Sequence, residues 1–546
     1  MCDMFLPALR RAWPLILGLL LLISPAVSGA SAAAPTPPPS QAVVDPTGSN
    51  PTGPVVEAPG PQSVQQQLDH LKYAINFAWV LVCAFLVMFM QVGFALLETG
   101  LVRAKNAAHT MSMNFLVYVL SVVAFWAVGF AIMCGGANGV PGGASAPLIG
   151  GPSGLGGVPT LNHMFFIHIA GKPFGLFGLR GFFLAEHGYD AAVAIWFLYM
   201  LVFMDTAATI PTGALAERWS FKSFFIFSLF IGSVIYPFYG CWMWGGGWLA
   251  ALGHNFGLGH GAVDFAGSSV VHMQGGVIAL VCAWMLGPRL GKYDVDGRPQ
   301  PILGHHIPMV ITGTLILAFG WFGFNAGSSM AGTDLRVGII AVNTMLASAA
   351  GALASAVLLW TVYGKPDPSM MCNGMLAGLV AITAGCAFVQ PWAAILIGAF
   401  AGVISDLSVF FFERRGIDDP VGAISVHFIG GLWGIIAVGL FADGSYGMGW
   451  QGVSGHVTGL FYGDAKQLVA QLIAGGTCFV WNFCVAGGIF WAIGRFLRTN
   501  RVPPEVEVAG LDIPELGAPG YPEFITPIAP EMVSRSQIES MGRPFG

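Results

Sequence analysis

The fold of this 546-residue chain is decided by two similar stretches, DFAGSSVVHMQGG (Asp264–Gly276) and DPVGAISVHFIGG (Asp419–Gly431). They match at six of thirteen positions with a constant offset of 155: the Asp, a Gly, a Val, the His and a pair of Gly residues. Each stretch opens an apolar segment of about 20 residues or more, long enough to cross a hydrocarbon core of roughly 30 Å. The chain therefore contains an internal repeat of membrane-spanning segments.

The composition is that of a polytopic membrane protein. Hydrophobic residues make up 55% of the chain, charged residues 9%, and the mean hydropathy is +0.72, whereas a soluble domain carries roughly 25% charged residues. So little polar surface excludes a cytosolic enzyme, a secreted domain and a disordered scaffold. The net charge of −5 gives no reason to expect nucleic-acid binding. The nine cysteines contain no C-x-x-C pair and are interpreted as small hydrophobic residues, not as disulfides or a metal site.

Eleven apolar segments are long enough to cross the bilayer, so we predict an all-α polytopic membrane protein with eleven transmembrane helices. Their approximate cores are 74–97, 107–133, 191–214, 223–245, 264–287, 308–328, 337–362, 370–388, 391–412, 419–441 and 467–494. The two similar stretches open the fifth and the tenth span. Because this separation of five spans is odd, the second copy runs through the bilayer in the opposite direction. The predicted plan is an inverted 5+5 repeat plus one span, common among secondary transporters, with the working site near the midplane.

The two ends of the chain are predicted to lie outside the membrane domain. Arg10 and Arg11 precede a short apolar run, Ala12–Ile23, and small residues at Ser28–Ala30, which is the pattern of a cleavable signal peptide. The alternative is an additional span, but the run is short and prolines bracket it. The predicted organisation is a signal peptide at 1–30, a disordered Pro/Ala/Gly-rich leader at 31–72, a transmembrane domain at 73–498 and a C-terminal tail at 499–546.

Basic residues indicate the orientation in the membrane. The five loops predicted inside carry ten Lys and Arg residues, whereas the five outer loops, although longer in sum, carry four. Because Lys and Arg are enriched in cytoplasmic loops, we expect a multi-pass protein of the cell inner (plasma) membrane. Its N-terminus is expected outside and its C-terminal tail in the cytoplasm.

His272 and His427 occupy the same position in the two copies. Each lies eight residues after the Asp at the mouth of its span, or about 12 Å at 1.5 Å per residue. His272 enters from outside and His427 from inside, so both are expected near the middle of a core of roughly 30 Å. A lone buried histidine is usually structural, but ionisable residues inside a bilayer are costly and usually functional. The symmetry of the two therefore predicts a paired functional role.

Several motifs resemble those of the ammonium transporter family, on the Amt side of the wider Amt/Rh group. They are WGGGWLA…HGAVDFAGSSVVH (Trp244–His272), GWFGFNAGS (Gly320–Ser328), GALAER (Gly213–Arg218) and DDPVGAISVH (Asp418–His427). The resemblance covers about residues 73–515 in the correct order. It implies an eleven-span fold, a homotrimer and a separate pore through each subunit. The leader 31–72 and the outer segment 135–188 are longer than the family minimum, and no function is assigned to them.

The resemblance also implies a role for each candidate site residue. These residues are Trp244 and Ser328 at the outer recruitment site, Phe203 and Phe324 in the stacked gate, His272 and His427 in the pore, and Asp264 as a structural carboxylate near the recruitment site. Asp264 either caps its helix or stabilises the cation site indirectly, and Asp419, at the symmetric inner position before Pro420, is interpreted as structural. A Trp ring offers a cation a π face worth roughly 0.5–2 kcal/mol, and a serine hydroxyl accepts an N–H hydrogen bond. Two neutral imidazoles can share one proton and relay it. Without the resemblance, the aromatic residues are interpreted as core or interface residues.

Four further residues differ from the family pattern or need explanation. Tyr199 stands four residues before Phe203, where relatives often have a second Phe, and Phe428 follows the second pore histidine, where Gly is frequent. Asp205 and Asp406 are carboxylates inside the third and ninth spans, and the sequence does not identify their partners.

The predicted function is an ammonium transporter or channel, not an enzyme, and no cofactor or metal is expected. The outer site recruits ammonium, which loses its proton, and ammonia passes a hydrophobic pore lined by the two histidines, with or without a relayed proton. One alternative is an ammonium sensor that uses the same site. Such sensors usually carry a signalling domain after the last span, whereas only about 50 residues follow that span here. A membrane metalloenzyme would need a third ligand. An Rh-like gas channel is disfavoured by Trp244 with Ser328 and by the Asp418–Pro420 motif.

The tail contains a motif of its own, RVPPEVEVAGLDIPELG (Arg501–Gly517). It resembles the cytoplasmic segment of the family that carries a Gly-Leu-Asp element, here Gly510, Leu511 and Asp512. The resemblance implies that a PII-type signalling protein docks on the tail. The expected partners are therefore ammonium or ammonia, PII, further copies of the chain and the lipid bilayer, with no nucleic acid.

Overall fold

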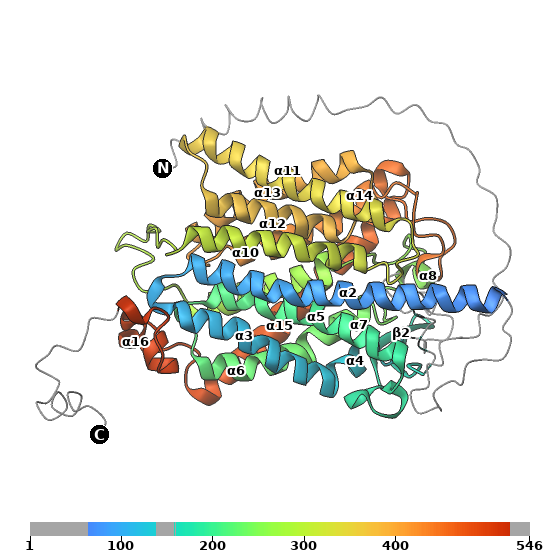
Figure 1. Cartoon of the computed structure of the whole chain (residues 1–546), viewed down its shortest axis with the longest axis horizontal. Coiled ribbons are helices and arrows are strands. Elements are labelled where there is room, and N and C mark those ends of the chain that lie inside the picture. The colour runs from blue at the N-terminus through green and yellow to red at the C-terminus, as the bar shows by residue number, and fades with distance from the viewer. Residues whose placement is uncertain (1–63, 138–154, 156–157, 159, 525–546) are drawn as a thin grey trace, which may run out of the picture.

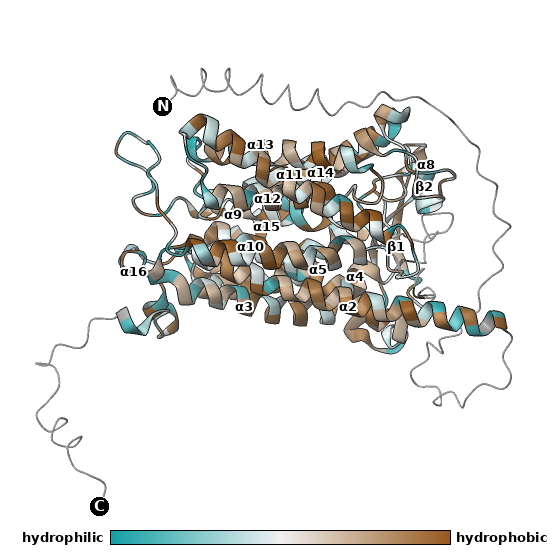
Figure 2. Cartoon of the chain, turned by 45° about the horizontal axis from the view of Figure 1, so that its top comes forward, coloured by the Kyte–Doolittle hydropathy of each residue, from teal (hydrophilic) through white to brown (hydrophobic). Residues whose placement is uncertain are grey.

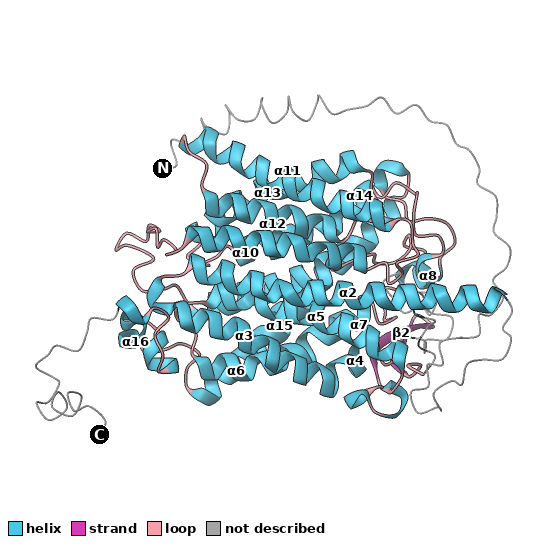
Figure 3. Cartoon of the chain, in the orientation of Figure 1, coloured by secondary structure: helices cyan, strands magenta, loops and turns pink. Residues whose placement is uncertain are grey.

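The protein is a bundle of long helices. The computed structural model describes residues 64–137, 155, 158 and 160–524. The helices run side by side, and the loops gather at the two ends of the bundle (Figures 1 and 3). The bounds are α2 (Val64–Leu101), α3 (Ala107–Ala124), α4 (Phe130–Cys134), α5 (Ala191–Leu215), α6 (Phe221–Phe230), α7 (Tyr236–Met243), α8 (Leu252–Phe256), α9 (Gln274–Leu286), α10 (Ile307–Trp321), α11 (Val337–Tyr363), α12 (Pro368–Thr383), α13 (Pro391–Arg414), α14 (Gly430–Phe441), α15 (Ala465–Leu497) and α16 (Pro504–Ala509). The predicted all-α membrane fold is confirmed.

Ten helices of the described residues have the length and hydropathy to cross a membrane, against the eleven spans predicted. The eighth predicted span, 370–388, corresponds to α12, which is apolar but has only 16 residues. At 1.5 Å per residue it is about 24 Å long. The chain turns after Thr383 and reaches Pro391, where α13 begins. Among the described residues, ten helices are therefore long enough to cross a membrane, and the eighth predicted span, whose hydropathy is diluted by Gly and Cys, is a shorter apolar helix.

Element boundaries differ from the predictions at three places. Helix α2 begins at Val64, so residues 64–72 of the predicted leader form the first turns of this helix. The predicted signal peptide and the rest of the leader lie outside the described residues. Helical structure in the fifth and tenth spans begins only at Ser268 and Ile424, because the aspartates at 264 and 419 cap these helices from the preceding loop.

The surface of the bundle matches a lipid environment. Hydrophobic residues dominate the middle of the bundle and hydrophilic residues gather at its two ends (Figure 2). Large apolar side chains are exposed on its flanks, among them Trp284, Trp360 and Val480. A soluble protein rarely exposes so many contiguous apolar side chains, so these flanks are expected to face lipid or a second copy of the chain.

One end of the bundle, called here the hairpin end, carries a small antiparallel sheet. Strands β1 (Met164–Ile169) and β2 (Lys172–Gly178) pair from Met164 with Gly178 to Ile169 with Lys172. A hydrogen bond joins the hairpin to α7, because Trp242 Nε1 of α7 donates to the Leu176 carbonyl of β2 (2.9 Å). Part of the predicted outer segment 135–188 is therefore an ordered cover over α7.

The opposite end, called here the tail end, carries α16 and the segment that follows it (Figure 1). Asp512 accepts hydrogen bonds from the backbone N–H groups of Ala108 (3.1 Å) and His109 (2.8 Å) at the start of α3. Glu515 accepts one from the N–H of Phe221 (2.8 Å) at the start of α6. Carboxylates at these positions satisfy helix N–H groups that otherwise lack partners. The tail is thus an integral cap of the bundle.

A buried ionic cluster joins the helices at the tail end. Arg289 donates two hydrogen bonds to the carboxylate of Asp418 (2.8 and 2.9 Å), and Arg218 donates to the Asp418 carbonyl (2.7 Å). Burial alone would raise the pKa of Asp418, but these hydrogen bonds and positive charges outweigh it and hold the pKa well below its usual range. The cluster fixes the ends of α5 and α9 against the loop that begins the second repeat.

Candidate functional site

The two histidines of the repeat meet inside the bundle. Their Nδ1 atoms are 3.2 Å apart, and their rings are stacked with centroids 5.2 Å apart. Both side chains are buried, with exposed fractions of 0% for His272 and 4% for His427. At this distance one nitrogen can donate a hydrogen bond to the other, with the tautomers setting which ring is the donor. The structure therefore brings together the two residues that the repeat had predicted to meet.

Each histidine lies in a π-helical turn, Ser268–Met273 in the first copy and Ile424–Ile429 in the second. In such a turn the chain bonds five residues back, as His272 N does to the Gly267 carbonyl (3.1 Å). π-Helical turns are rare and occur frequently at functional sites. The same local geometry in both copies gives the two rings equivalent positions.

The aspartates in front of these turns are caps. Asp264 Oδ1 accepts from the N–H groups of Gly267 (2.8 Å) and Ser268 (2.9 Å), and Oδ2 accepts from those of Ser269 (2.7 Å) and Val270 (3.0 Å). The hydroxyl of Ser269 also donates to Oδ2 (2.7 Å), so five hydrogen bonds to one carboxylate hold the first turn in place.

Asp419 does the same in the second copy. Its Oδ1 accepts from the N–H groups of Val421 (3.2 Å) and Gly422 (3.0 Å), and its Oδ2 from that of Ile424 (2.7 Å). Asp264 has one further contact, because its carbonyl accepts from Trp244 Nε1 (2.7 Å). Both carboxylates therefore cap the π-helical turns that carry the histidines, and the Asp264 carbonyl also holds the indole of Trp244.

The last glycine of each stretch, the second of its Gly-Gly pair, allows the two halves to cross closely. A Cβ atom on Gly276 would lie 2.2 Å from the backbone N of Phe428, and one on Gly431 would lie 2.4 Å from the carbonyl of Ser268. The π-helical turn of the first copy packs against α14, and that of the second copy packs against α9. The sequence had paired these glycines by their spacing, and the structure shows that each removes a steric block beside a histidine.

Trp244 and Ser328 lie toward the hairpin end of the site. Trp244 packs edge-on against Phe203, with ring centroids 5.9 Å apart, and Ser328 Oγ donates to the Phe324 carbonyl (2.8 Å). Tyr199 connects these groups: its hydroxyl is 2.9 Å from the Gly323 carbonyl and 3.3 Å from Ser328 Oγ. Tyr199 was noted in the sequence only as a departure from the family pattern, and its hydroxyl proves to be part of the site.

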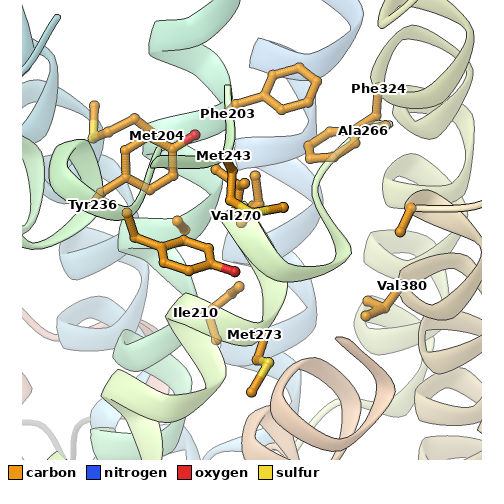
Figure 4. Close-up of a cluster of buried hydrophobic side chains, with 14 of the residues drawn as sticks. Phe203, Met204, Ile210, Tyr236, Met243, Ala266, Val270, Met273, Phe324 and Val380 are labelled. Atoms are coloured by element: carbon orange, nitrogen blue, oxygen red, sulfur yellow. The ribbon is translucent and has the colours of Figure 1, made fainter. Parts of the chain in front are cut away.

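The rings of Phe203 and Phe324 lie next to each other in the core (Figure 4). Their ring centroids are 4.0 Å apart, their planes are inclined by 22°, and both side chains are 0% exposed. Phe324 in turn stacks on His272, with centroids 5.4 Å apart, and Trp321 stacks on the same imidazole at 5.0 Å. Trp321 had not been singled out in the sequence, because nothing in its spacing distinguishes it from a core aromatic.

The histidine pair opens toward the tail end through a narrow cavity. The cavity is lined by Phe94, Leu97, Glu98, Ile210, Asn373, Leu376, Val421, Ala423, Val426 and His427. It shares Asn373 and Val421 with a larger vestibule of about 620 Å³ at the tail end. Glu98 was missed in the sequence because the predicted core of the first span ended one residue before it. Helix α2 continues to Leu101, so this carboxylate lies inside the helix.

The structure identifies a partner for one of the two carboxylates inside the spans. Asp406 Oδ2 accepts a hydrogen bond from Ser355 Oγ (2.7 Å), and Oδ1 of both Asp205 and Asp406 is buried with no hydrogen-bond partner among the described residues. The Phe428 ring packs on Phe479 of α15, with centroids 5.7 Å apart.

The eight cysteines within the described part of the chain are free, and seven of them are buried. This part of the chain holds no group of three or more His, Cys, Asp or Glu residues arranged for a metal ion.

Comparison with known proteins identifies the family. Residues 78–521 match the model of the Ammonium Transporter Family. The chain is 46% identical to the ammonium transporter Amt2 of Archaeoglobus fulgidus over 468 residues, which is 85% of this chain and 92% of that protein. It is 36% identical over 470 residues to the ammonium transporter Amt1 of Haloferax mediterranei, covering 84% and 81% of the two chains.

Solved structures agree with this result. A structure described as a Sensor Amt Protein superposes with a TM-score of 0.69 at 32% identity, covering 82% of this chain and all of that one. Mep2 of Candida albicans has the same fold, with a TM-score of 0.63 at 24% identity over 78% of this chain and 86% of Mep2. The match to the family model and the identity with Amt2 together establish that the chain belongs to the ammonium transporter family.

Proposed function

We propose that the protein recruits ammonium at Trp244 and Ser328, removes its proton, and conducts ammonia past Phe203 and Phe324 to the histidine pair. The observation that carries this proposal is the continuous column of aromatic rings that ends on two imidazoles in contact. The direct test is ion and substrate flux by the purified protein in liposomes, with ammonium compared against K⁺. Equal flux of both, or of neither, would contradict the proposal.

Electrostatics explains why ammonium must lose its proton before it enters the pore. Moving a bare ion into an apolar environment costs tens of kcal/mol by Born estimates, and the column between Trp244 and His272 is buried and mostly apolar. A π face and a hydroxyl favour the cation at the mouth. Ammonia, the neutral form that remains when ammonium loses its proton, carries no such penalty. Deprotonation near the hairpin end therefore separates ammonium from K⁺ and Na⁺, which have no proton to lose.

The Phe203–Phe324 stack supports a gate. Two fully buried rings 4.0 Å apart leave no room for a hydrated ion between them. A small neutral molecule needs only a slight rotation of one ring. The stack therefore excludes hydrated cations by size while its movement admits ammonia.

The histidines supply the hydrogen-bonding groups that an apolar pore lacks. Their Nδ1 atoms face one another, and Nε2 of His272 is buried with no hydrogen-bond partner among the described residues. This nitrogen is available to orient ammonia. The shared proton between the rings lets the pair pass a proton onward as well.

The proposal extends to the whole protein. It places the N-terminus outside, the tail end in the cytoplasm of a cell with an inner (plasma) membrane, and one pore in each subunit of a homotrimer. It also places a PII-type protein on the tail. The signal peptide at 1–30 directs the N-terminus across the membrane. The many Lys and Arg residues in the tail-end loops support this orientation.

An ammonium sensor is the second candidate. It is favoured by the similarity to the solved structure described as a Sensor Amt Protein, all of which is covered by this chain. The two functions differ in one measurement, since a sensor that only binds ammonium shows no flux in liposomes.

Recruitment is tested at Trp244 and Ser328. Trp244→Leu removes the π face, so we expect uptake at low ammonium to fall several-fold, in line with a cation–π energy of roughly 0.5–2 kcal/mol. Maximal flux should change less. Ser328→Ala should act in the same direction. Uptake is measured over a range of ammonium concentrations, with Trp284→Leu on the exposed flank as the control. Parental uptake of dilute ammonium by both site variants would place recruitment elsewhere.

Topology is tested with tags at the two ends. The basic loops and the signal peptide predict that a tag on the mature N-terminus is accessible from outside and a tag after Gly546 only from inside. Accessibility to a protease or a membrane-impermeant label on intact cells measures this. Tags on the same side would refute the proposed orientation.

The tail is tested by substitutions on its exposed face. Deleting the chain after about Arg501 should abolish the response to PII, but it also removes the Asp512 and Glu515 caps. Val508→Asp and Ile513→Asp change side chains that are 67% and 57% exposed. We expect an intact transporter whose inhibition by a PII protein is weakened about tenfold or more, as expected when an apolar anchor is lost from an interface. Unchanged inhibition in reconstituted membranes would refute the docking site.

A further inference from the structure

Helix α2 carries a buried carboxylate near its tail-end terminus. Glu98 is 2% exposed, and its Oε2 accepts hydrogen bonds from Asn114 Nδ2 (2.7 Å) and Thr212 Oγ1 (2.8 Å). Within the described part of the chain no Lys, Arg or His forms an ion pair with it. Ionisable residues inside a membrane are costly, and those that persist mark paths for ions and protons.

The position of Glu98 is more informative than its burial. It lines the same narrow cavity as His427. The cavity is narrow, with a volume of about 10 Å³, which is at the lower limit of what holds one water. A molecule that leaves the histidine pair toward the tail end therefore passes the Glu98 carboxylate singly.

The surroundings of this cavity are otherwise apolar. Phe94, Leu97, Ile210 and Leu376 form much of its wall, and the polar side chain in its lining besides Glu98 and His427 is that of Asn373. Proton exchange in the cavity must therefore use His427 or Glu98.

The charges that act on Glu98 are few. Asp419 is close enough to repel the carboxylate electrostatically, and its own oxygens are held by backbone N–H groups. Asn114 and Thr212 are neutral donors that cannot titrate near neutral pH. A proton, or an ammonium ion, is thus the species that neutralises Glu98.

We propose that Glu98 is the proton acceptor at the tail-end exit of the pore and that it returns this proton to the departing ammonia. In the first step an N–H bond of protonated His427 breaks and an O–H bond forms on Glu98, directly or through one water. In the second step this O–H bond breaks, an N–H bond forms on ammonia, and ammonium enters the vestibule while the carboxylate is regenerated. This inference rests on the proposed function and adds one proton-transfer site to the same pore.

Glu98→Gln separates this role from a structural one. Glu98 joins α2 to Asn114 of α3 and Thr212 of α5, and the amide oxygen of Gln can accept both hydrogen bonds. The amide cannot carry a proton between two nitrogen bases. Asp406→Asn is the matched control, because Asp406 is also buried in a long helix, accepts from a hydroxyl of Ser355, and lines neither the cavity nor the vestibule.

The experiment uses purified full-length protein in liposomes that contain a pH-sensitive dye. Mildly acidic external buffer keeps free ammonia low, and protein-free liposomes report the leak through lipid. After an ammonium pulse, the parent and Asp406→Asn should take up ammonium with little change of internal pH, because ammonia and its proton arrive together. Glu98→Gln should take it up at least ~10-fold more slowly, given the usual contribution of a positioned acid–base group, and the remaining uptake should make the interior alkaline.

The outcomes distinguish the two proposals. A parent protein whose uptake is no faster than the leak, or is unaffected by loss of both histidines, contradicts the proposed function itself. A parent with histidine-dependent uptake, together with a Glu98→Gln variant of equal rate and equal internal pH trace, overturns the role of Glu98. So does a parent that makes the interior as alkaline as Glu98→Gln does.

A second measurement needs no variant. A hydrophobic carbodiimide modifies protonated carboxyl groups in apolar surroundings. Applied to the parent protein in liposomes, it should modify Glu98, as read by peptide mass spectrometry, and stop uptake in proportion to the fraction modified. Full modification of Glu98 with parental uptake would overturn the inference.

Discussion

His272→Leu and His427→Leu should each leave a folded protein that has lost most of its ammonium flux or its discrimination against K⁺. Either change removes half of the 3.2 Å Nδ1···Nδ1 contact and leaves the other ring alone in an apolar pore. An unpaired buried polar group costs about 1–3 kcal/mol, which a bundle with this many buried contacts can tolerate. The functional loss should be larger, because the apolar pore then has no pair of groups that share a proton.

The measurement is flux of ammonium and of K⁺ into liposomes for both single variants and the double variant. An acidic replacement at one of the two positions should be milder than Leu, because a carboxyl group still passes a proton. Phe479→Leu is a useful control, since it changes a ring that packs on Phe428 beside the pair and not the pair itself. Parental flux and parental selectivity in all three histidine variants would mean that the pair is structural only.

Gly276→Ala and Gly431→Ala should be among the most damaging small substitutions in the chain. Their Cβ atoms would lie 2.2 Å and 2.4 Å from backbone atoms of Phe428 and Ser268, and backbone cannot move aside as a flexible side chain can. Overpacking of a filled core costs about 1–3 kcal/mol and occasionally more. Any relief must shift a π-helical turn that carries a histidine, so activity should fall even where the protein still folds.

Thermal unfolding in detergent and ammonium flux measure these two effects. Gly430→Ala is the neighbouring control, because its Cβ would meet Val380 at 3.4 Å and the carbonyl oxygen of Ala377 at 3.6 Å, both ordinary van der Waals distances. Gly476→Ala in α15 is the second control, since nothing lies within 4 Å of its Cβ position. We expect both controls to unfold and transport like the parent. If Gly276→Ala and Gly431→Ala were equally silent, the close crossing of the two copies would be wrong.

Much of the site could be predicted from the sequence because the repeat carries its own geometry. An offset of 155 pairs His272 with His427, and the odd number of intervening spans predicts that they approach from opposite sides. Trp244, Ser328, Phe203 and Phe324 required the family resemblance, since a tryptophan or phenylalanine in an apolar helix usually belongs to the core. Their contacts join α5, the loop after α7 and the π-helical turn that follows α10, which are distant in the sequence.

Other residues could not be found without the tertiary structure. Tyr199 differs from a core aromatic only by a hydroxyl whose partners, Gly323 and Phe324, lie more than a hundred residues away. Glu98 was not identified because the apolar core predicted for the first span ends one residue before it. In the structure, Glu98 lies inside helix α2 and accepts hydrogen bonds from Asn114 and Thr212. Packing between helices, which local sequence does not encode, decided both.

The sequence by itself determined that this chain crosses a membrane many times, that its halves are inverted copies, and that two histidines are equivalent. These conclusions follow from hydropathy and spacing, which depend on residues a few positions apart or on exact repetition. The tertiary structure decided where helix α12 ends and that the tail caps α3 and α6. It also decided that the carboxylate of Glu98 lies on the tail-end side of the histidines. These features depend on which helix ends and side chains meet, and that is set by long-range packing in three dimensions.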